Sequence, residues 1–257
     1  MKQIVIDQMQ REVELVSPLL RIVSLVPSQT ELLVDLGLEE QLVGVTKFCV
    51  HPKGLKNRIQ QIGGTKNVDI QKVIDLKPDL VIGNKEENFK SDIDELEKHV
   101  PVWMSDIYTL DDAYEMIQQI GKLTDTEVKA LTLIDGIKSE FKQLIPLKEK
   151  KKCLYLIWRK PYMAAGKNTF IDHLLEQLGF ENALQIDRYP EVEFTNLGTD
   201  FIFLSSEPYP FKEKHIEELQ TIFPNAESRL VDGEYFSWYG SRLLDAPNYF
   251  NQLLSYF

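Results

Sequence analysis

One short stretch of this sequence combines two side chains that bind metals or act in nucleophilic chemistry. Cys49 and His51 stand two residues apart in a loop-like segment. A thiolate and an imidazole are zinc ligands, and Glu86 or Glu87 from a following loop could complete such a set. The same pair could also serve as nucleophile and base. A structural alternative, in which His51 caps the turn before Pro52, is favoured over both.

A second pattern joins cations with aromatic rings in the segments that follow short apolar runs. Ligands of parallel α/β sheets gather where the carboxyl ends of the strands meet these segments. Cations and aromatic faces suit a bulky ligand that is partly anionic and partly apolar. The predicted ligand-binding residues are Lys47, Phe48, Lys66, Lys85, Trp158, Arg159, Arg188, Tyr189, Phe236, Trp238 and Tyr239. The run Phe236–Gly240 is the main support for a ligand-binding site, because it is unusually aromatic for an exposed loop. The alternative is that loops are polar in any protein and that some of these rings belong to the core.

The elements that would carry these residues alternate between strand-like and helical patterns. Apolar, β-rich runs occupy residues 20–26, 41–46, 79–83 and 101–104, and again 152–158, 200–206 and 227–233. Helical spacing separates them, as in Leu110 to Leu123 and in Thr169 to Phe180. Ser28 or Thr30 is expected to cap the helix after the first run, and Pro247 to interrupt a helix over 238–256. Repeated β-loop-α units predict parallel strands with crossover helices.

A long helix is predicted between the two series of strands. Thr124 and Glu127 form a capping-box pattern, apolar residues recur at helical spacing from Val128 to Leu144, and Pro146 is a stop signal. A helix over 124–145 would be a rod of roughly 33 Å. We therefore expect an α/β protein with two Rossmann-like lobes joined by one backbone helix: an N-terminal lobe (1–123), the helix (124–146) and a C-terminal lobe (147–257).

Composition narrows the classes of partner. The net charge of −11 argues against nucleic acid and against an anionic membrane surface, although a local basic patch remains compatible with it. The sequence contains no apolar run of the ~20 residues that a transmembrane helix needs. The first 16 residues are charged where a signal peptide has its apolar core, so the sequence as written predicts a cytoplasmic chain, and a trimmed exported protein would look the same.

Three stretches carry a resemblance to a known family. RIVSLVPSQTELLVDLGL, LVGVT and GGTKNVDIQKVIDLKPDLVIG resemble the N-terminal lobe of the helical-backbone substrate-binding proteins of ABC importers, and the predicted long helix falls where that family has its backbone helix. The resemblance implies a non-enzymatic binding protein, which we expect to be monomeric and to need no cofactor. It implies a metal chelate held between the lobes (cobalamin, a ferric siderophore or haem), an ABC transporter permease as partner and a periplasmic or membrane-tethered location.

The resemblance also bears on individual residues. Surface glutamates of this family dock onto the transporter, and the corresponding candidates here are Asp69, beside Gln71 in the first lobe, and Glu191 or Glu193 in the second. Cobalamin receptors tend to have a tryptophan in the loop that is Gly63–Asn67 here, and this sequence has none there. Two alternatives stay open: a cytosolic carrier or sensor of chelates or corrinoids with the same fold, and an α/β enzyme that uses Cys49 and His51.

Overall fold

The computed structural model describes residues 2–195 and 197–256, and these residues form two compact units. The first unit runs to Asp106 and adds Asp111–Ile137 and Tyr239–Leu244. The second comprises Ile107–Leu110, Lys138–Trp238 and the chain from Asp245 onward. The division into 1–123, 124–146 and 147–257 stays a prediction, because contacts alone do not show which segments fold independently.

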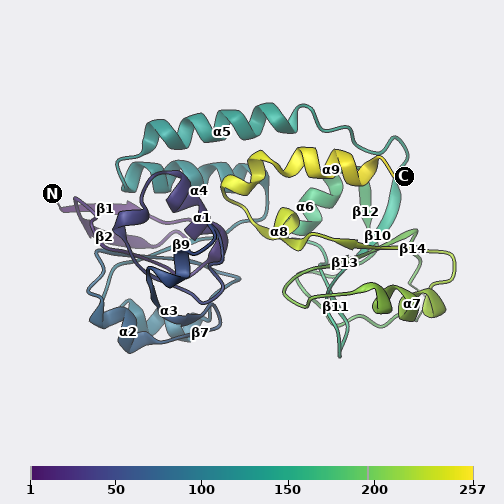
Figure 1. Ribbon diagram of the computed structural model, residues 1–257, viewed down its shortest axis with the longest axis horizontal. Helices are drawn as coiled ribbons and strands as arrows, with labels where there is room; N and C mark the ends of the chain where they lie inside the picture. Colours follow the sequence, from purple (N-terminus) through teal and green to yellow (C-terminus); the bar gives the residue numbers. More distant parts are fainter. Residues whose placement is uncertain (1, 196, 257) are drawn as a thin grey trace. The chain divides into compact units, whose positions relative to one another are not determined.

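A parallel sheet of five strands forms the centre of the first unit (Figure 1). Its order is β5 (Gln60–Gln61), β4 (Leu42–Val45), β3 (Ile22–Ser24), β8 (Leu80–Asn84) and β9 (Val102–Ser105). Strands β3, β8 and β9 are buried throughout, which explains why they read as continuous apolar runs. The chain leaves β3 toward β4 on one side and returns to β8 on the other, so the strand order reverses at β3.

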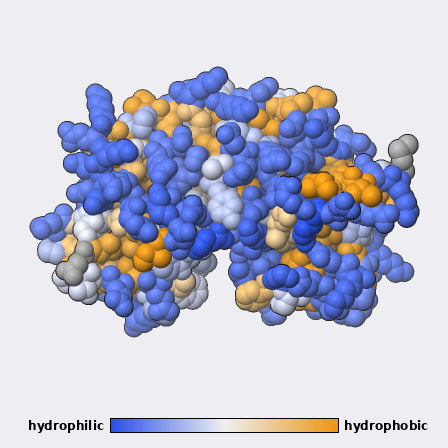
Figure 2. Space-filling view, turned by 180° about the vertical axis from the view of Figure 1, so that it is seen from behind, coloured by the Kyte–Doolittle hydropathy of each residue, from blue (hydrophilic) through white to orange (hydrophobic). Residues whose placement is uncertain are grey.

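Two hairpins accompany this sheet. Strands β1 (Lys2–Ile6) and β2 (Glu12–Val16) pair antiparallel, and β6 (Gly63–Gly64) pairs with β7 (Asn67–Val68). In the first hairpin Val13 and Leu15 are buried, whereas Ile4 is 65% exposed. The exposed face of the hairpin is mixed, because Ile4 and Ile6 pair with Glu14 and Glu12. Figure 2 shows apolar patches among mostly hydrophilic residues on one face of the molecule.

The helices of the first unit follow the predicted pattern with one correction. They are α1 (Pro27–Asp35), α2 (Ile70–Asp75), α3 (Lys90–Leu96) and α4 (Leu110–Leu123), with 3₁₀ turns η1 (Glu39–Gln41) and η2 (Leu55–Asn57). The bounds of α4 match the prediction. The expected cap of α1 is wrong: the helix begins at Pro27, before both candidates, and the Thr30 hydroxyl donates to the Val26 carbonyl over 3.0 Å.

The predicted rod is a shorter helix, α5 (Glu127–Phe141). Its 15 residues correspond to about 22 Å, not 33 Å. Thr124 does not cap it, because its hydroxyl donates to the Ile120 carbonyl at the end of α4 over 2.7 Å. The buried face consists of Ala130, Ile134 and Ile137, while Val128 is 80% exposed. Helices α4 and α5 run side by side in Figure 1.

The second unit contains another mainly parallel sheet. Strands β10 (Lys151–Trp158), β13 (Phe201–Ser205) and β14 (Glu227–Val231) are parallel neighbours. Along its other edge, β10 pairs in parallel with β12 (Phe180–Asn182) and antiparallel with β11 (Met163–Ala164). The helices are α6 (Phe170–Gln177), α7 (Glu213–Ile222), α8 (Gly233–Ser237) and α9 (Ala246–Leu254), and η3 (Ser241–Leu244) belongs to the first unit. Pro247 lies in the first turn of α9, so it starts this helix and does not interrupt a longer one.

These observations confirm the predicted fold class: an α/β protein with two lobes built on parallel sheets. Among the described residues, no helix combines the length and apolarity that crossing a membrane requires.

Candidate functional site

Three loops meet at the carboxyl edge of the first unit's sheet. The Lys47 N–H donates to the Gly63 carbonyl over 2.8 Å, which joins the loop after β4 to the β6–β7 hairpin. The Asn88 side chain donates to the Thr65 carbonyl over 3.0 Å, which joins the same hairpin to the loop after β8. A Cβ at Gly64 would lie 3.1 Å from Phe48 Cε2, so a glycine here lets the ring lie against the hairpin.

This edge presents two half-exposed aromatic rings, each with a lysine above it. Phe48 and Phe89 are both 50% exposed. Lys47 Nζ lies 5.0 Å from the centre of the Phe48 ring, and Lys66 Nζ lies 5.2 Å from that of Phe89. Such pairs combine an apolar face with positive charge. The sequence-based prediction included three of these residues and missed Phe89, although it follows β8 by only five positions.

A buried polar layer fixes these loops from below. Gln29 Nε2 and Asn84 Nδ2 donate to Ser105 Oγ over 2.6 and 2.9 Å. Lys85 Nζ forms an ion pair with Asp106 Oδ2 at 2.6 Å, so this lysine is held at the edge by a carboxylate. These hydrogen bonds and this ion pair restrict the motion of the groups that they join.

The structure places Cys49 in the core and not in an open loop. It is 0% exposed, and its Sγ lies 3.1 Å from Thr30 Oγ1 and 3.3 Å from Thr46 Oγ1. Burial raises the pKa of this thiol, which disfavours the thiolate needed by a nucleophile or a metal ligand. Within residues 2–195 and 197–256, no three His, Cys, Asp or Glu side chains are grouped as a metal site would need. The metal site of Cys49 and His51 stays a prediction.

In the second unit, Trp158 is the last residue of β10, and Arg159 follows it. Trp158 is 41% exposed and its ring lies edge-on to Tyr209, with centroids 5.8 Å apart. Arg159 Nη2 forms an ion pair with Glu218 Oε2 at 2.7 Å, and the Tyr162 hydroxyl donates to the other oxygen over 2.8 Å. The hydrogen bonds from Arg159 and Tyr162 lower the pKa of Glu218. Trp158 is therefore accessible to a ligand, whereas Arg159 is already held by a carboxylate.

Arg188 and Tyr189 lie in the loop that follows β12. Arg188 has a φ of 71°, and its guanidinium carbon lies 5.4 Å from the centre of the Tyr108 ring. Its N–H donates to the Lys167 carbonyl over 2.8 Å. A Cβ at Gly166 would lie 1.9 Å from the Ile186 carbonyl oxygen, so only glycine permits this approach of two backbone segments. Tyr189 is half-buried.

The aromatic run Phe236–Gly240 is not an exposed loop, which corrects the expectation that gave it most weight. Phe236 is 0% exposed, and its ring centre lies 5.0 Å from that of Tyr155 and 4.9 Å from that of Phe250. Trp238 and Tyr239 are each 6% exposed, and Trp238 Nε1 donates to Glu207 Oε1 over 2.9 Å. These three rings pack in the core, as the structural alternative held, and their contact with a ligand stays a prediction.

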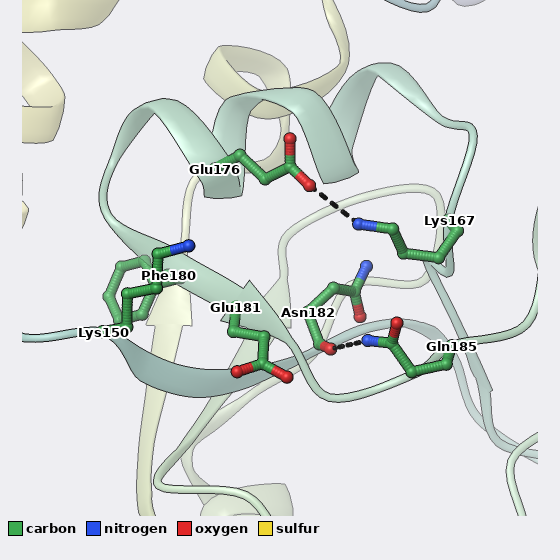
Figure 3. Close-up of a pocket in the computed structure, with 7 residues that line it drawn as sticks. All are labelled: Lys150, Lys167, Glu176, Phe180, Glu181, Asn182 and Gln185. Atoms are coloured by element: carbon green, nitrogen blue, oxygen red, sulfur yellow. Dashed lines mark hydrogen bonds and ion pairs between the residues drawn. The ribbon is translucent and has the colours of Figure 1, made fainter.

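A separate pocket of about 280 Å³ lies in the second unit (Figure 3). Because β12 pairs with the first residues of β10, this pocket lies at the opposite edge from Trp158. Lys167 contacts Asp172 Oδ2 at 3.0 Å and Glu176 Oε1 at 2.8 Å, so the charge of this lysine is matched within the protein. The lining residues are Lys150, Lys167, Glu176, Phe180, Glu181, Asn182 and Gln185.

The predicted docking carboxylates lie on the surface. Asp69 caps α2 by accepting from the Lys72 N–H over 3.2 Å, and it pairs with Lys72 Nζ at 3.0 Å. The hydrogen bond from the Lys72 side chain lowers the pKa of Asp69. Glu191 and Glu193 are exposed. Their role in docking stays a prediction.

Comparisons with known proteins agree on one family. A family model described as "Periplasmic binding protein" matches residues 22–208. An uncharacterized ABC transporter substrate-binding lipoprotein of Bacillus subtilis, YvrC, is 31% identical over 175 residues, which cover 63% of this chain and 55% of that protein. A vitamin B12-binding protein of Vibrio campbellii is 26% identical over 232 residues, covering 86% of this chain and 76% of that protein. The chain thus aligns with little more than half of the first relative's length.

Solved structures share the fold. The periplasmic haem-binding protein HutB of Vibrio cholerae superposes with a TM-score of 0.76 at 22% identity, covering 91% of this chain and 98% of that one. At this identity the likeness shows a common fold, and the ligand has to be inferred from the residues themselves.

Proposed function

This chain belongs to the periplasmic binding protein family, and on that basis we propose that it is the solute-binding component of an ABC importer for an anionic metal chelate. Members of this family bind solutes and do not transform them, so the chain is a binding protein and not an enzyme. The proposed ligand class comprises corrinoids, haem and ferric siderophores. We further propose that the protein acts outside the cytoplasmic membrane, and the description of one relative as a substrate-binding lipoprotein supports this location.

One observation carries the proposal: the paired rings and lysines at the carboxyl edge of the first sheet. Phe48 and Phe89 each expose half of their surface, although burial would stabilise both. Exposed rings on loops that hydrogen bonds join to one another supply contact area at low entropic cost. The ammonium groups of Lys47 and Lys66 above them suit the carboxylates or phosphates that such chelates carry.

The second unit has its own set of proposed ligand contacts. Trp158 is the accessible ring at the carboxyl end of β10, and Arg188 and Tyr189 supply a further cation and a further ring. We assign Arg159 an indirect role, because its ion pair with Glu218 holds the loop that carries Trp158. We assign Lys85 an indirect role too, because its ion pair with Asp106 holds the loop after β8.

Docking to a permease is proposed through Asp69 on the first lobe and Glu191 or Glu193 on the second. Gln71 stands where the family has a glutamate, and the Asp69 carboxylate already contacts Lys72. These two facts support weak docking at the first lobe, and they are the observations that favour the alternative of a carrier or sensor without a transporter. Binding of the purified permease, measured with Glu191→Gln and Glu193→Gln variants, distinguishes an importer component from a carrier or sensor.

The experiment that tests ligand binding is a thermal-shift panel with cobalamin, cobinamide, haem, several ferric siderophores, free zinc and free iron. A ligand present at 100 times its Kd adds about 2.7 kcal/mol to the free energy of unfolding. For a chain of this size, that corresponds to a shift of roughly 5–10 °C. A shift with one chelate supports the proposal, and a shift with bare metal alone would favour the Cys49–His51 site.

Variants make the panel specific for the proposed surface. Phe48→Ala and Phe89→Ala should each reduce the affinity for the active chelate by about tenfold, because each removes one apolar face. Tyr256→Ala is the matched control: it removes an exposed ring that also has a cation, Arg229, 5.0 Å from its centre. Equal loss in all three variants, or in none, would contradict the assignment of this surface.

A further inference from the structure

The second unit contains a strongly basic stretch in an otherwise acidic protein. Residues 138–152, here called the basic segment, contain six lysines and two glutamates, a net charge of +4 in a chain whose net charge is −11. The ligand-binding proposal does not involve this segment. It comprises the last turn of α5, the connection that follows and the first two residues of β10, at the end of that strand opposite to Trp158.

An isoleucine stands exposed among these lysines. Ile145 is 73% exposed, and Lys142 and Lys148, three residues to either side of it, are exposed too. Lys150 is also exposed. An exposed apolar side chain flanked in sequence by exposed lysines is typical of protein surfaces that contact the headgroup region of a bilayer.

The backbone of the segment is held by side chains and backbone groups of the same unit. The Ile145 N–H donates to Asn251 Oδ1 over 2.9 Å, and Asn251 Nδ2 donates to the Gln143 carbonyl over 3.1 Å. The Leu147 N–H donates to the Leu178 carbonyl over 3.0 Å. In Figure 1 the segment passes beside α9, which carries Asn251. These contacts hold the backbone on both sides of Ile145, whose side chain is exposed.

Acidic residues next to the basic segment neutralise only some of its lysines. Glu149 lies 3.7 Å from Lys151, and Lys152 is next to Glu181 in the sheet register. Lys142, Lys148 and Lys150 are the three exposed lysines closest in sequence to Ile145. They give this surface a positive potential that a negatively charged surface would match.

We propose that the basic segment is a membrane-contact surface that binds the anionic headgroups of a phospholipid bilayer, with Ile145 entering the interfacial layer. Clusters of four to eight basic residues bind such bilayers, each contributing roughly a two- to fivefold gain in affinity. The contact is reversible, because stable attachment needs a second signal besides the cluster. It would turn one face of the second unit toward the membrane.

The test is co-sedimentation of the purified protein with lipid vesicles at low ionic strength. The wild-type protein is expected to bind vesicles in which about a third of the phosphatidylcholine is replaced by phosphatidylglycerol, and not pure phosphatidylcholine vesicles. Binding should fall steeply between about 50 and about 500 mM salt. The triple variant Lys142→Gln, Lys148→Gln, Lys150→Gln should lose at least about tenfold in affinity, and Ile145→Ser about threefold.

The control removes the same charge elsewhere. The triple variant Lys53→Gln, Lys77→Gln, Lys214→Gln changes three exposed lysines outside the segment and should bind anionic vesicles within about twofold of wild type. Circular dichroism verifies that every variant is folded. Equal loss in both triple variants, or no binding of the wild type to anionic vesicles, would overturn the proposal. Binding to soluble inorganic polyphosphate without binding to vesicles would overturn it as well.

Discussion

Arg242 and Glu31 form a bidentate ion pair that joins the segment after α8 to helix α1. Arg242 Nη2 lies 2.6 Å from Glu31 Oε1, and Arg242 Nε lies 3.1 Å from Oε2. The side chains are only 14% and 17% exposed. Ser241 adds a hydrogen bond to Asp35 on the same helix. The segment Tyr239–Leu244, from the C-terminal part of the chain, therefore packs on the first unit beside α1.

Arg242→Met should destabilise the protein by about 3–5 kcal/mol, because it leaves the Glu31 carboxylate buried without its partner. Desolvation raises the pKa of Glu31 even with Arg242 present, so the carboxylate depends on this arginine. Urea denaturation measures the loss. The double variant Glu31→Gln, Arg242→Met should recover part of it, since no charge stays buried alone. A loss below about 1 kcal/mol in the single variant would show that the pair contributes little.

Glu207 should make the free energy of unfolding depend on pH. It accepts from the Ser237 hydroxyl over 2.7 Å and from Trp238 Nε1 over 2.9 Å, yet burial raises its pKa. The folded state then binds this proton at a higher pH than the unfolded state. The contribution of Glu207 to stability is therefore greatest at acidic pH, and it falls as the pH rises from the unfolded-state pKa through the raised folded-state value.

Glu207→Gln should remove this dependence. The amide oxygen still accepts from Trp238, and no charge is buried, so the variant should be as stable as wild type or more stable at pH 7. Urea denaturation from pH 4.5 to 8 gives the comparison. Glu217→Gln, an exposed position on α7, is the control. Parallel pH profiles for wild type and Glu207→Gln would show that the Glu207 carboxyl does not titrate differently in the two states.

Close packing of α4 on α5 depends on one glycine. A Cβ at Gly121 would lie 2.5 Å from Ala130 Cβ and 3.2 Å from Glu127 Cα, so Gly121→Ala should cost about 1–3 kcal/mol although alanine favours helices. At Gly136 on α5, a Cβ would meet one atom of the described residues, Leu244 Cδ1 at 3.0 Å, the end of a side chain that is 39% exposed. Gly136→Ala should therefore be neutral or stabilise by up to ~1 kcal/mol. Thermal unfolding of both variants provides the test, and similar shifts would contradict the packing argument.

Sequence patterns predicted the elements whose structure is set locally. Leu110–Leu123 forms a helix with the expected bounds, because its amphipathic pattern and its burial agree. The buried strands were predicted from their apolar runs. The predicted length of α5 was wrong because of a tertiary contact. Leu144 and Ile145 continue the helical spacing, but the Ile145 N–H donates to Asn251, more than 100 residues away.

The candidate site was harder to predict than the fold, because composition does not tell an exposed ring from a buried one. Phe48 and Phe236 both follow strands beside polar residues, yet one is 50% exposed and the other 0%. Phe236 meets Tyr155 and Phe250, which are distant in sequence, and no local pattern indicates that contact. Phe89 was missed because the charged residues before it dominate the pattern of that loop.

The two cysteines give a chemical test of the core that bears on the open metal hypothesis. Cys49 and Cys153 are both 0% exposed, and burial raises the pKa of each thiol. A thiol reagent should therefore leave both unmodified in the native protein at pH 8 for at least about a hundred times longer than in urea, where both become accessible. Mass spectrometry of the alkylated peptides distinguishes the two positions. Rapid modification of Cys49 with Cys153 protected would show that the 49–51 loop opens in solution. His51 and Cys49 could then meet a metal, and retention of zinc after dialysis by the wild type and by Cys49→Ser would decide whether they do.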